Sequence, residues 1–248
     1  MPRVDYDTQA KQYHTGRRVS LESISGWRDA LVGFMPPDDR PILDVGAGTG
    51  IWMHAFATWF GKPVVGVEPS RGMRNVASTR RRDRATWIVA GRGEAIPLGR
   101  DTCSMAWLST VVHHLDDVGA CASELRRVLP AGAPVFIRNS FPHRHDEIML
   151  FRFFDGARQV ADAFPDIATV SREFASAGFE TIELLRVREP AATSLEAARE
   201  WYVSMRHTDS AFVQLSDEEF ARGLAKLDEA ISNGEEPIPL GLDLLVLA

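Results

Sequence analysis

Two acidic residues bracket a run of alternating glycines in the first third of the chain. Asp44 ends an apolar stretch and is followed by Gly46, Gly48 and Gly50, and Glu68 ends the next apolar stretch. Glycine lets a backbone turn sharply and approach a ligand where any Cβ would collide, and a helix that begins after it presents free N–H groups. A carboxylate at position 68 can accept hydrogen bonds from both hydroxyls of a ribose. The pattern therefore predicts a nucleoside site on an open α/β sheet.

Two other interpretations of this glycine pattern fit the residues less well. The dinucleotide fingerprint G-x-G-x-x-G requires glycine where this chain has Ile51, which argues against a nicotinamide cofactor. A glycine-rich turn in an unrelated α/β protein is the other alternative, and it leaves the second acid at Glu68 unexplained. A nucleoside without a pyrophosphate suits the pattern better.

The segment Asp44–Gly50 resembles the D/E-x-G-x-G-x-G signature of the class I S-adenosyl-L-methionine (SAM) methyltransferases. Three further segments resemble motifs of the small-molecule branch of that family, which is related to the ubiquinone and menaquinone methyltransferases. They are Tyr6–Tyr13, Gly91–Leu98 and Val111–Leu115, and they follow the family's order within residues 1–140. The resemblance implies that the protein uses S-adenosyl-L-methionine and releases S-adenosyl-L-homocysteine.

The resemblance also implies which residues contact the cofactor. They are Tyr6, Arg17, Asp44, Gly46, Ala47, Gly48, Gly50, Glu68, Pro69, Gly93, Glu94 and Ser109. Arg17 is expected to pair with the methionyl carboxylate, and Tyr6 to close over the methyl group.

Arg92 departs from the family pattern, because an acid that contacts the adenine amine usually stands at this position. A guanidinium has only donors and cannot accept a hydrogen bond from that amine. Either Glu94 or a backbone carbonyl accepts it, or Arg92 points away and the N–H groups of Gly93 and Glu94 hold the adenine. The departure leaves the motifs at Gly46 and Glu68 intact.

Histidines stand at two strand ends where a catalytic base is expected. A phenol, hydroxyl or ammonium acceptor must lose a proton before or during methyl transfer, and histidine is the usual agent. His113 and His114 follow the fourth expected strand, and His143 and His145 follow the fifth. The first pair has a non-catalytic alternative, because by resemblance similar pairs occur in family members with unrelated acceptors. The alternative for the second pair is a solvated helix start.

Acceptor contacts are expected from the N-terminus, from the fifth strand and from a late insertion. The candidates are Tyr13, Arg138, Asn139, Trp201, Tyr202 and Arg206. An arginine at position 138 can bind a carboxylate of the acceptor, or it forms a salt bridge inside the cap. The aromatic residues of the insertion either contact the acceptor or pack the insertion onto the sheet.

The apolar pattern predicts the elements that position these residues. Strands are expected at 41–45, 63–67, 85–90, 104–109, 133–139, 180–187 and 238–248, and helices at 50–60, 71–82 and 118–129, after an N-terminal helix that ends before Pro36. This alternation specifies an α/β fold with a doubly wound, mostly parallel seven-stranded sheet. By resemblance it is the Rossmann-like class I methyltransferase fold, whose seventh strand runs antiparallel between the fifth and sixth.

We expect one methyltransferase domain over residues 1–248. Residues 1–140 would form the SAM-binding core with the N-terminal helix. Helical patterns near 145–163, 195–206 and 217–232 fall within the segments 141–178 and 190–235. These two segments are expected to form a helical cap over the acceptor site, because ligands of open α/β sheets bind at the carboxyl ends of the strands.

Composition and charge limit the classes of partner that the protein is expected to bind. The chain has 248 residues, is 45% hydrophobic and carries a net charge of −6, so nothing attracts it generally to nucleic acid. The arginines between residues 71 and 84 indicate a solvated helix face more than an RNA surface. No apolar run is long enough for a membrane span, so a cytoplasmic location is expected. Cys103 and Cys121 have no spacing typical of a metal site and are expected in the core.

These observations favour a SAM-dependent methyltransferase that acts on O, N or C of a small organic metabolite. One alternative is a SAM-binding regulatory protein that has lost transfer, and Arg92 is the feature that favours it. A SAM-dependent cyclase or lyase is another, and an RNA methyltransferase is a third. The expected partner is a small-molecule methyl acceptor, with no nucleic acid, membrane or metal, and the pattern does not predict an oligomeric state.

Overall fold

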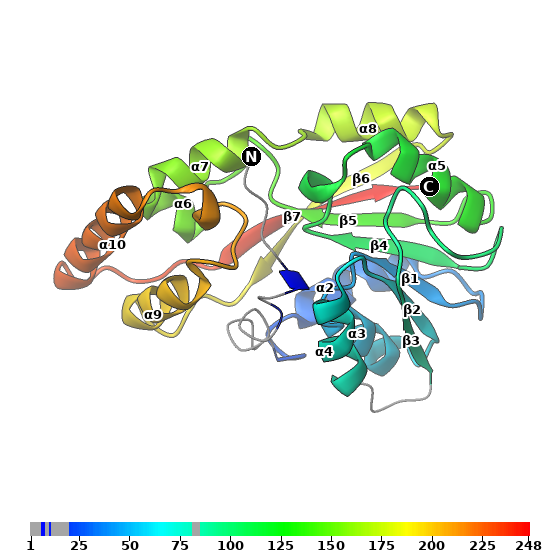
Figure 1. Ribbon diagram of the computed structural model, residues 1–248, viewed down its shortest axis with the longest axis horizontal. Helices are drawn as coiled ribbons and strands as arrows, with labels where there is room; N and C mark the ends of the chain where they lie inside the picture. The colour runs from blue at the N-terminus through cyan, green and yellow to red at the C-terminus, as the bar shows by residue number, and fades with distance from the viewer. Residues whose placement is uncertain (1–5, 8–9, 11–19, 81–84) are drawn as a thin grey trace.

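The computed structural model describes residues 6–7, 10, 20–80 and 85–248 (Figure 1). Within them the strands form one sheet in the order β3-β2-β1-β4-β5-β7-β6. The strands are β1 (Ile42–Val45), β2 (Val64–Val67), β3 (Thr86–Val89), β4 (Met105–Ser109), β5 (Val135–Asn139), β6 (Thr181–Glu189) and β7 (Leu240–Leu247). Only β7 pairs antiparallel, with β5 on one side and β6 on the other. The predicted fold class and the place of the seventh strand are confirmed.

Helices cover both faces of the sheet because the strand residues alternate between two apolar clusters. The helices of the first face are α2 (Ser25–Leu31), extended by η1 (Val32–Phe34), α3 (Ile51–Phe60) and α4 (Arg71–Arg80). Those of the second face are α5 (Val118–Val128) and α8 (Ile167–Ser176), which lie side by side in Figure 1. On the first face, the rings of Trp27, Trp52 and Phe56 all pack against Trp107 of β4.

A helical lobe extends from one end of the sheet, at the left of Figure 1. It consists of α6 (Met149–Phe153), α7 (Asp155–Asp162), α9 (Leu195–Met205), η3 (Phe212–Gln214) and α10 (Asp217–Ser232). The buried ring of Phe154 lies at its centre and packs against the rings of Tyr202, Phe212 and Phe220. Three separate elements, α9, η3 and α10, thus pack around one aromatic side chain.

Two sequence predictions about this region are wrong. The helix expected at 145–163 begins only at Met149 and is interrupted at Phe154, where φ is −113° and ψ is 84°. The interruption turns the ring of Phe154 into the lobe. Helix α8 was not predicted, and it packs beside α5 on the sheet instead of joining the lobe, so the segment 141–178 does not lie wholly in the cap.

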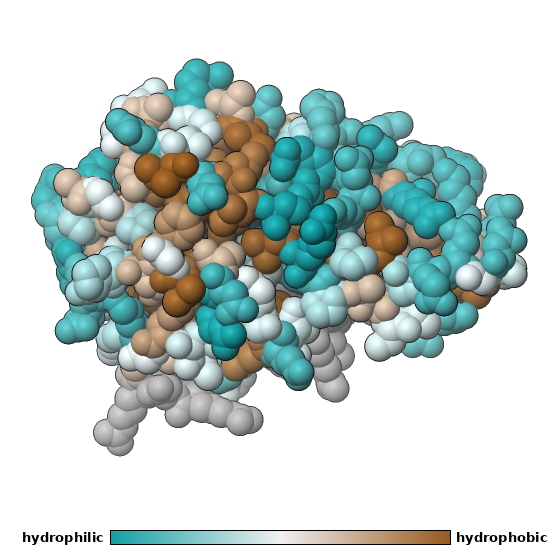
Figure 2. Space-filling view, turned by 180° about the vertical axis from the view of Figure 1, so that it is seen from behind, coloured by the Kyte–Doolittle hydropathy of each residue, from teal (hydrophilic) through white to brown (hydrophobic). Residues whose placement is uncertain are grey.

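The surface differs between the sheet and the lobe. Seen from behind, apolar residues gather over the sheet half, and the lobe is mostly hydrophilic (Figure 2). Val32 of η1 and Ile182 of β6 are among the exposed large apolar side chains, at 63% and 54% exposure. Among the helices that the structure describes, none is both long enough and apolar enough to span a bilayer.

Gly223 of α10 gives a test of the packing around Phe154. A Cβ at this position would lie 2.1 Å from Cδ1 of the Phe154 ring. We expect Gly223→Ala to lower the free energy of unfolding by about 1–3 kcal/mol, although alanine favours helices over glycine. Urea denaturation measures the change. Gly33→Ala is the control, because nothing lies within 4 Å of its Cβ position; equal effects of the two substitutions would contradict this packing.

Candidate functional site

A cavity of about 400 Å³ opens at the carboxyl ends of β1, β2, β4 and β5 and continues to the lobe. This volume is in the range of small-molecule sites. Many predicted site residues line it, namely Tyr6, Gly46, Gly48, Glu68, Pro69, Gly93, Glu94, Ser109, His113, His114 and Asn139. The structure thus brings together residues from the N-terminus, four strand ends and the histidine motif.

Glu68 is a buried carboxylate held by the backbone at the end of β2. Its Oε2 accepts a hydrogen bond of 2.8 Å from the N–H of Gly48, and its Oε1 accepts one of 2.8 Å from the N–H of Ser70. Burial raises the pKa of Glu68, and these two N–H donors act in the opposite direction. Each oxygen keeps a second lone pair with which it can accept another hydrogen bond. The side chain can therefore bind a diol in the cavity.

The glycines after β1 have different tasks. All three have left-handed φ angles, of +68°, +54° and +76° for Gly46, Gly48 and Gly50. A Cβ on Gly46 would lie 2.5 Å from Val111, so close packing excludes it there. The nearest atom to a Cβ on Gly48 is 3.9 Å away, and this residue lines the cavity. The space that Gly48 leaves open is therefore available to a ligand.

Three residues predicted to contact the cofactor do not line the cavity. They are Asp44, in β1, and Ala47 and Gly50, in the glycine loop itself, and all three are buried. Asp44 is 1% exposed, and burial raises its pKa well above the usual range, with the nearby charge of Glu68 adding to the effect.

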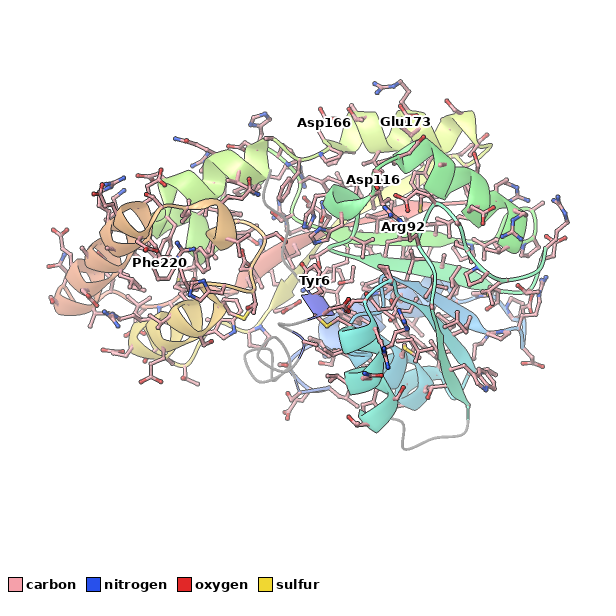
Figure 3. All side chains as sticks on the ribbon, in the orientation of Figure 1. Tyr6, Arg92, Asp116, Asp166, Glu173 and Phe220 are labelled. Carbon is pink, nitrogen blue, oxygen red and sulfur yellow. The ribbon has the colours of Figure 1, made fainter. Side chains whose placement is uncertain are left out.

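Arg92 faces a carboxylate that sequence reasoning missed. Its guanidinium pairs with Asp116, and the two side chains lie together in Figure 3. Glu94 joins the group, because its Oε2 lies 3.7 Å from Nε of Arg92 and its Oε1 accepts the N–H of Asp116 at 2.7 Å. Arg92 also lines the cavity, so it does not simply point away. Asp116 directly follows the histidine motif Val111–Leu115 in sequence, and this position is the feature from which its place at the cavity could have been predicted.

The histidine pair lies in η2 (Val112–His114) directly after β4, so it lines the cavity on the other side of β1 from Glu68. The two imidazole rings are 4.0 Å apart between centroids, and the ring of Phe164 stacks on His113 at 4.3 Å. The hydroxyl of Tyr6 lies 3.1 Å from Nε2 of His114. Ser210 Oγ, from the turn after α9, lies 3.4 Å from Nε2 of His113 and 3.3 Å from Nε2 of His114.

Tyr6 is held in place by its neighbour in the chain. Asp7 accepts hydrogen bonds from the hydroxyl of Ser70 at 2.7 Å and from the N–H of Gly72 at 2.9 Å, at the start of α4. These donors lower the pKa of Asp7, the Gly72 N–H most of all. Residues 6–7 therefore connect the Glu68 end of the cavity with its histidine end, and Figure 3 shows Tyr6 between the sheet and the lobe.

Other predicted residues lie away from the cavity lining. The side chain of His143 is 82% exposed, and the residue has a left-handed φ of +62°. His145 is buried beside Asp162, with Nε2 and Oδ1 3.0 Å apart, and burial lowers its pKa. Arg138 pairs with Glu189 at 2.5 Å and lies over the ring of Trp27 at 4.9 Å. Its salt bridge is therefore made to β6 and not inside the cap.

The residues expected from the insertion are absent from the lining too. Trp201 is 39% exposed, Tyr202 packs in the aromatic centre of the lobe, and Arg206 donates to the carbonyls of Phe212 and Leu215. The lobe reaches the cavity instead through Asp209, Ser210 and Ala211 in the turn after α9, and through Phe151 and Phe164. No sequence motif marked these residues. Tyr13 and Arg17 lie outside the described residues.

Within the described ranges, no cluster of histidine, cysteine, aspartate or glutamate side chains could hold a metal ion. Cys103 and Cys121 are both buried and free, as predicted.

Comparison with known proteins relates the chain to methyltransferases. The model of the methyltransferase domain family matches residues 43–137. An uncharacterized methyltransferase of Mycobacterium bovis is 30% identical over 129 residues, which cover 51% of this chain and 50% of that protein. The chain spans about half the length of the curated relatives it matches.

Solved structures share the fold over most of the chain. A protein of Anabaena variabilis, described as a candidate methyltransferase from an antibiotic biosynthesis pathway, has a TM-score of 0.73 at 21% identity, covering 89% of this chain and 95% of that one. Phosphoethanolamine N-methyltransferase 2 of Haemonchus contortus, solved with phosphomonomethylethanolamine and S-adenosylhomocysteine, has a TM-score of 0.60 at 15% identity and covers 98% of this chain and 57% of that one. Residues 43–137 therefore match a methyltransferase domain, and the chain shares its fold with solved structures described as methyltransferases.

Proposed function

We propose that the protein is a cytoplasmic SAM-dependent methyltransferase that methylates O, N or C of a small organic acceptor. The observation that carries the proposal is one continuous cavity with a buried carboxylate at one end and a histidine pair at the other. The end with Glu68 can bind a ribose, and the end with the histidine pair can accept a proton. A regulatory protein that only bound the nucleoside would not need the histidine pair.

The residues present fit the cofactor. Glu68 offers two oxygens to the ribose hydroxyls, and the absent side chain of Gly48 leaves room beside them. When bound, SAM supplies a methyl group activated by a positively charged sulfur. The neighbour from Haemonchus contortus, solved with S-adenosylhomocysteine, supports this assignment.

The chain's own residues align the acceptor, exclude water and accept a proton. Tyr6 lies over the histidine end, where a side chain anchored through Asp7 can keep water out. His113 and His114 are the groups that can accept a proton from the acceptor. Phe151 and Phe164 offer apolar walls to its carbon skeleton.

A small acceptor is favoured over RNA by the surroundings of the cavity. The turn 209–211 of the lobe borders its histidine end. Among the arginines of α4, Arg74 is used within the protein, because its guanidinium donates to the carbonyls of Glu68 and Pro69. The net charge of −6 points the same way.

Glu68→Ala tests the cofactor site. We expect the affinity for S-adenosylhomocysteine to fall by about 1–3 kcal/mol, or roughly 5- to 150-fold in Kd, because two ribose hydroxyls lose their acceptor. Isothermal titration calorimetry measures it, with the exposed Glu183→Ala as the matched control. A 2′,3′-dideoxy analogue separates ribose binding from loop support: the wild type should bind it more weakly, and Glu68→Ala should bind both ligands equally. An unchanged Kd in Glu68→Ala would reject the site.

Transfer itself is tested with a small-molecule extract of the cells that make the protein. We expect the wild type to convert SAM to S-adenosylhomocysteine in at least one fraction of the extract, and Glu68→Ala to do so more slowly at limiting SAM. Mass spectrometry follows both compounds and finds the methylated product by its added mass. Binding of SAM without conversion in any fraction would instead support a protein that does not methylate.

A further inference from the structure

The hydroxyl of Ser210 lies at a meeting point of three distant parts of the chain. Its Oγ is 3.4 Å from Nε2 of His113, 3.3 Å from Nε2 of His114 and 3.4 Å from the hydroxyl of Tyr6. The histidines come from the end of β4, Tyr6 from the N-terminus and Ser210 from the lobe. The lobe therefore places one polar group between the two imidazoles.

The turn that carries Ser210 is held from several sides. Gln214 Nε2 donates to the carbonyl of Ser210 at 3.1 Å, and Asp209 Oδ1 accepts the N–H of Ala211 at 2.9 Å. Arg206 donates to the carbonyls of Phe212 and Leu215 and lies over the ring of Phe220. Figure 3 shows Phe220 inside the lobe. The position of the hydroxyl is thus set by the packing of the lobe.

One hydroxyl cannot make the same hydrogen bond to both imidazoles. Serine has a single O–H donor and two acceptor lone pairs, and a neutral imidazole has one N–H and one bare nitrogen. Ser210 can therefore donate to Nε2 of only one histidine at a time, and from the other Nε2 it can only accept, which requires that this nitrogen carries the proton. The protonation sites of the two rings are consequently linked through Ser210.

We propose that Ser210 is a positioning residue that couples His113 and His114 into one proton relay at the acceptor end of the cavity. The proposal rests on the proposed methyl transfer. As the X–H bond of the acceptor breaks, its electron pair stays on X and the proton passes to Nε2 of His114. X bonds the methyl carbon while the methyl–sulfur bond breaks, and the electron pair of that bond remains on the sulfur, which becomes the neutral thioether of S-adenosylhomocysteine. Nε2 of His114 then donates to Ser210 Oγ while Ser210 gives its own proton to His113. One proton has moved from the acceptor to His113, and His114 and Ser210 are restored.

The relay also narrows the acceptor class. An acceptor atom with a free lone pair and no proton to lose needs no base, whereas a hydroxyl or an ammonium group must give up a proton when it is methylated. The acceptor atom is therefore an oxygen or nitrogen that carries a proton, flanked by the apolar rings of Phe151 and Phe164.

The test reads the imidazole tautomers directly. Protein labelled with 15N-histidine is studied by long-range 1H–15N NMR at a pH where the rings are neutral, and His113→Gln and His114→Gln assign the signals. In the wild type we expect at least one of the two rings to carry its proton on Nδ1, with Nε2 accepting. Ser210→Ala should change the Nδ1 and Nε2 shifts of both rings, and Ser210→Thr, which keeps the hydroxyl, should restore them.

Two controls separate this effect from general disturbance. Ser204→Ala, on the exposed side of α9, should leave both rings unchanged, as should the signal of the exposed His54 in every variant. If Ser210→Ala alters neither ring, or only one, the coupling does not exist. Calorimetry with S-adenosylhomocysteine should give a Kd within about twofold of the wild type for Ser210→Ala; failure of the wild type itself to bind would overturn the proposed function while leaving the tautomer result standing.

Discussion

The two hydrogen bonds from Gly48 and Ser70 to the buried carboxylate of Glu68 are the interaction on which the site depends. They tie the loop after β1 to the loop after β2, and a buried carboxylate without such donors would be costly. The same contact orients Ser70, whose hydroxyl binds Asp7 and so keeps Tyr6 over the histidines. One charged side chain thus organises the cofactor end and connects it with the acceptor end.

The packing of the lobe is the second feature on which the site depends. Phe154 interrupts what would be a continuous helix and becomes the aromatic centre of the lobe. Around it, α9 and η3 are brought into an arrangement that presents the turn 209–211 to the cavity. The polar chemistry of Ser210 therefore depends on apolar burial some distance from it. This division between a packed support and a few polar groups is typical of ligand sites.

The sequence allowed the sheet and the cofactor end to be predicted, because both depend on local patterns. Apolar strands, glycines with forced backbone angles and an acid at a strand end all leave signals within a few residues. Ser210 and Phe164 left none, because only the packing of the lobe brings them to His113. The aromatic pair at Trp201 and Tyr202 left two alternatives open for the same reason, because apolar residues on a helix suit a ligand site and a packed core equally well.

The central claim, that one cavity holds the nucleoside at Glu68 and the reacting centre beside the histidines, is tested most directly by a crystal structure with S-adenosylhomocysteine. The account predicts that both ribose hydroxyls lie within hydrogen-bond distance of the Glu68 carboxylate and that the sulfur faces His114 and Ser210. A ribose bound away from Glu68, or a sulfur directed away from the histidine pair, would contradict it.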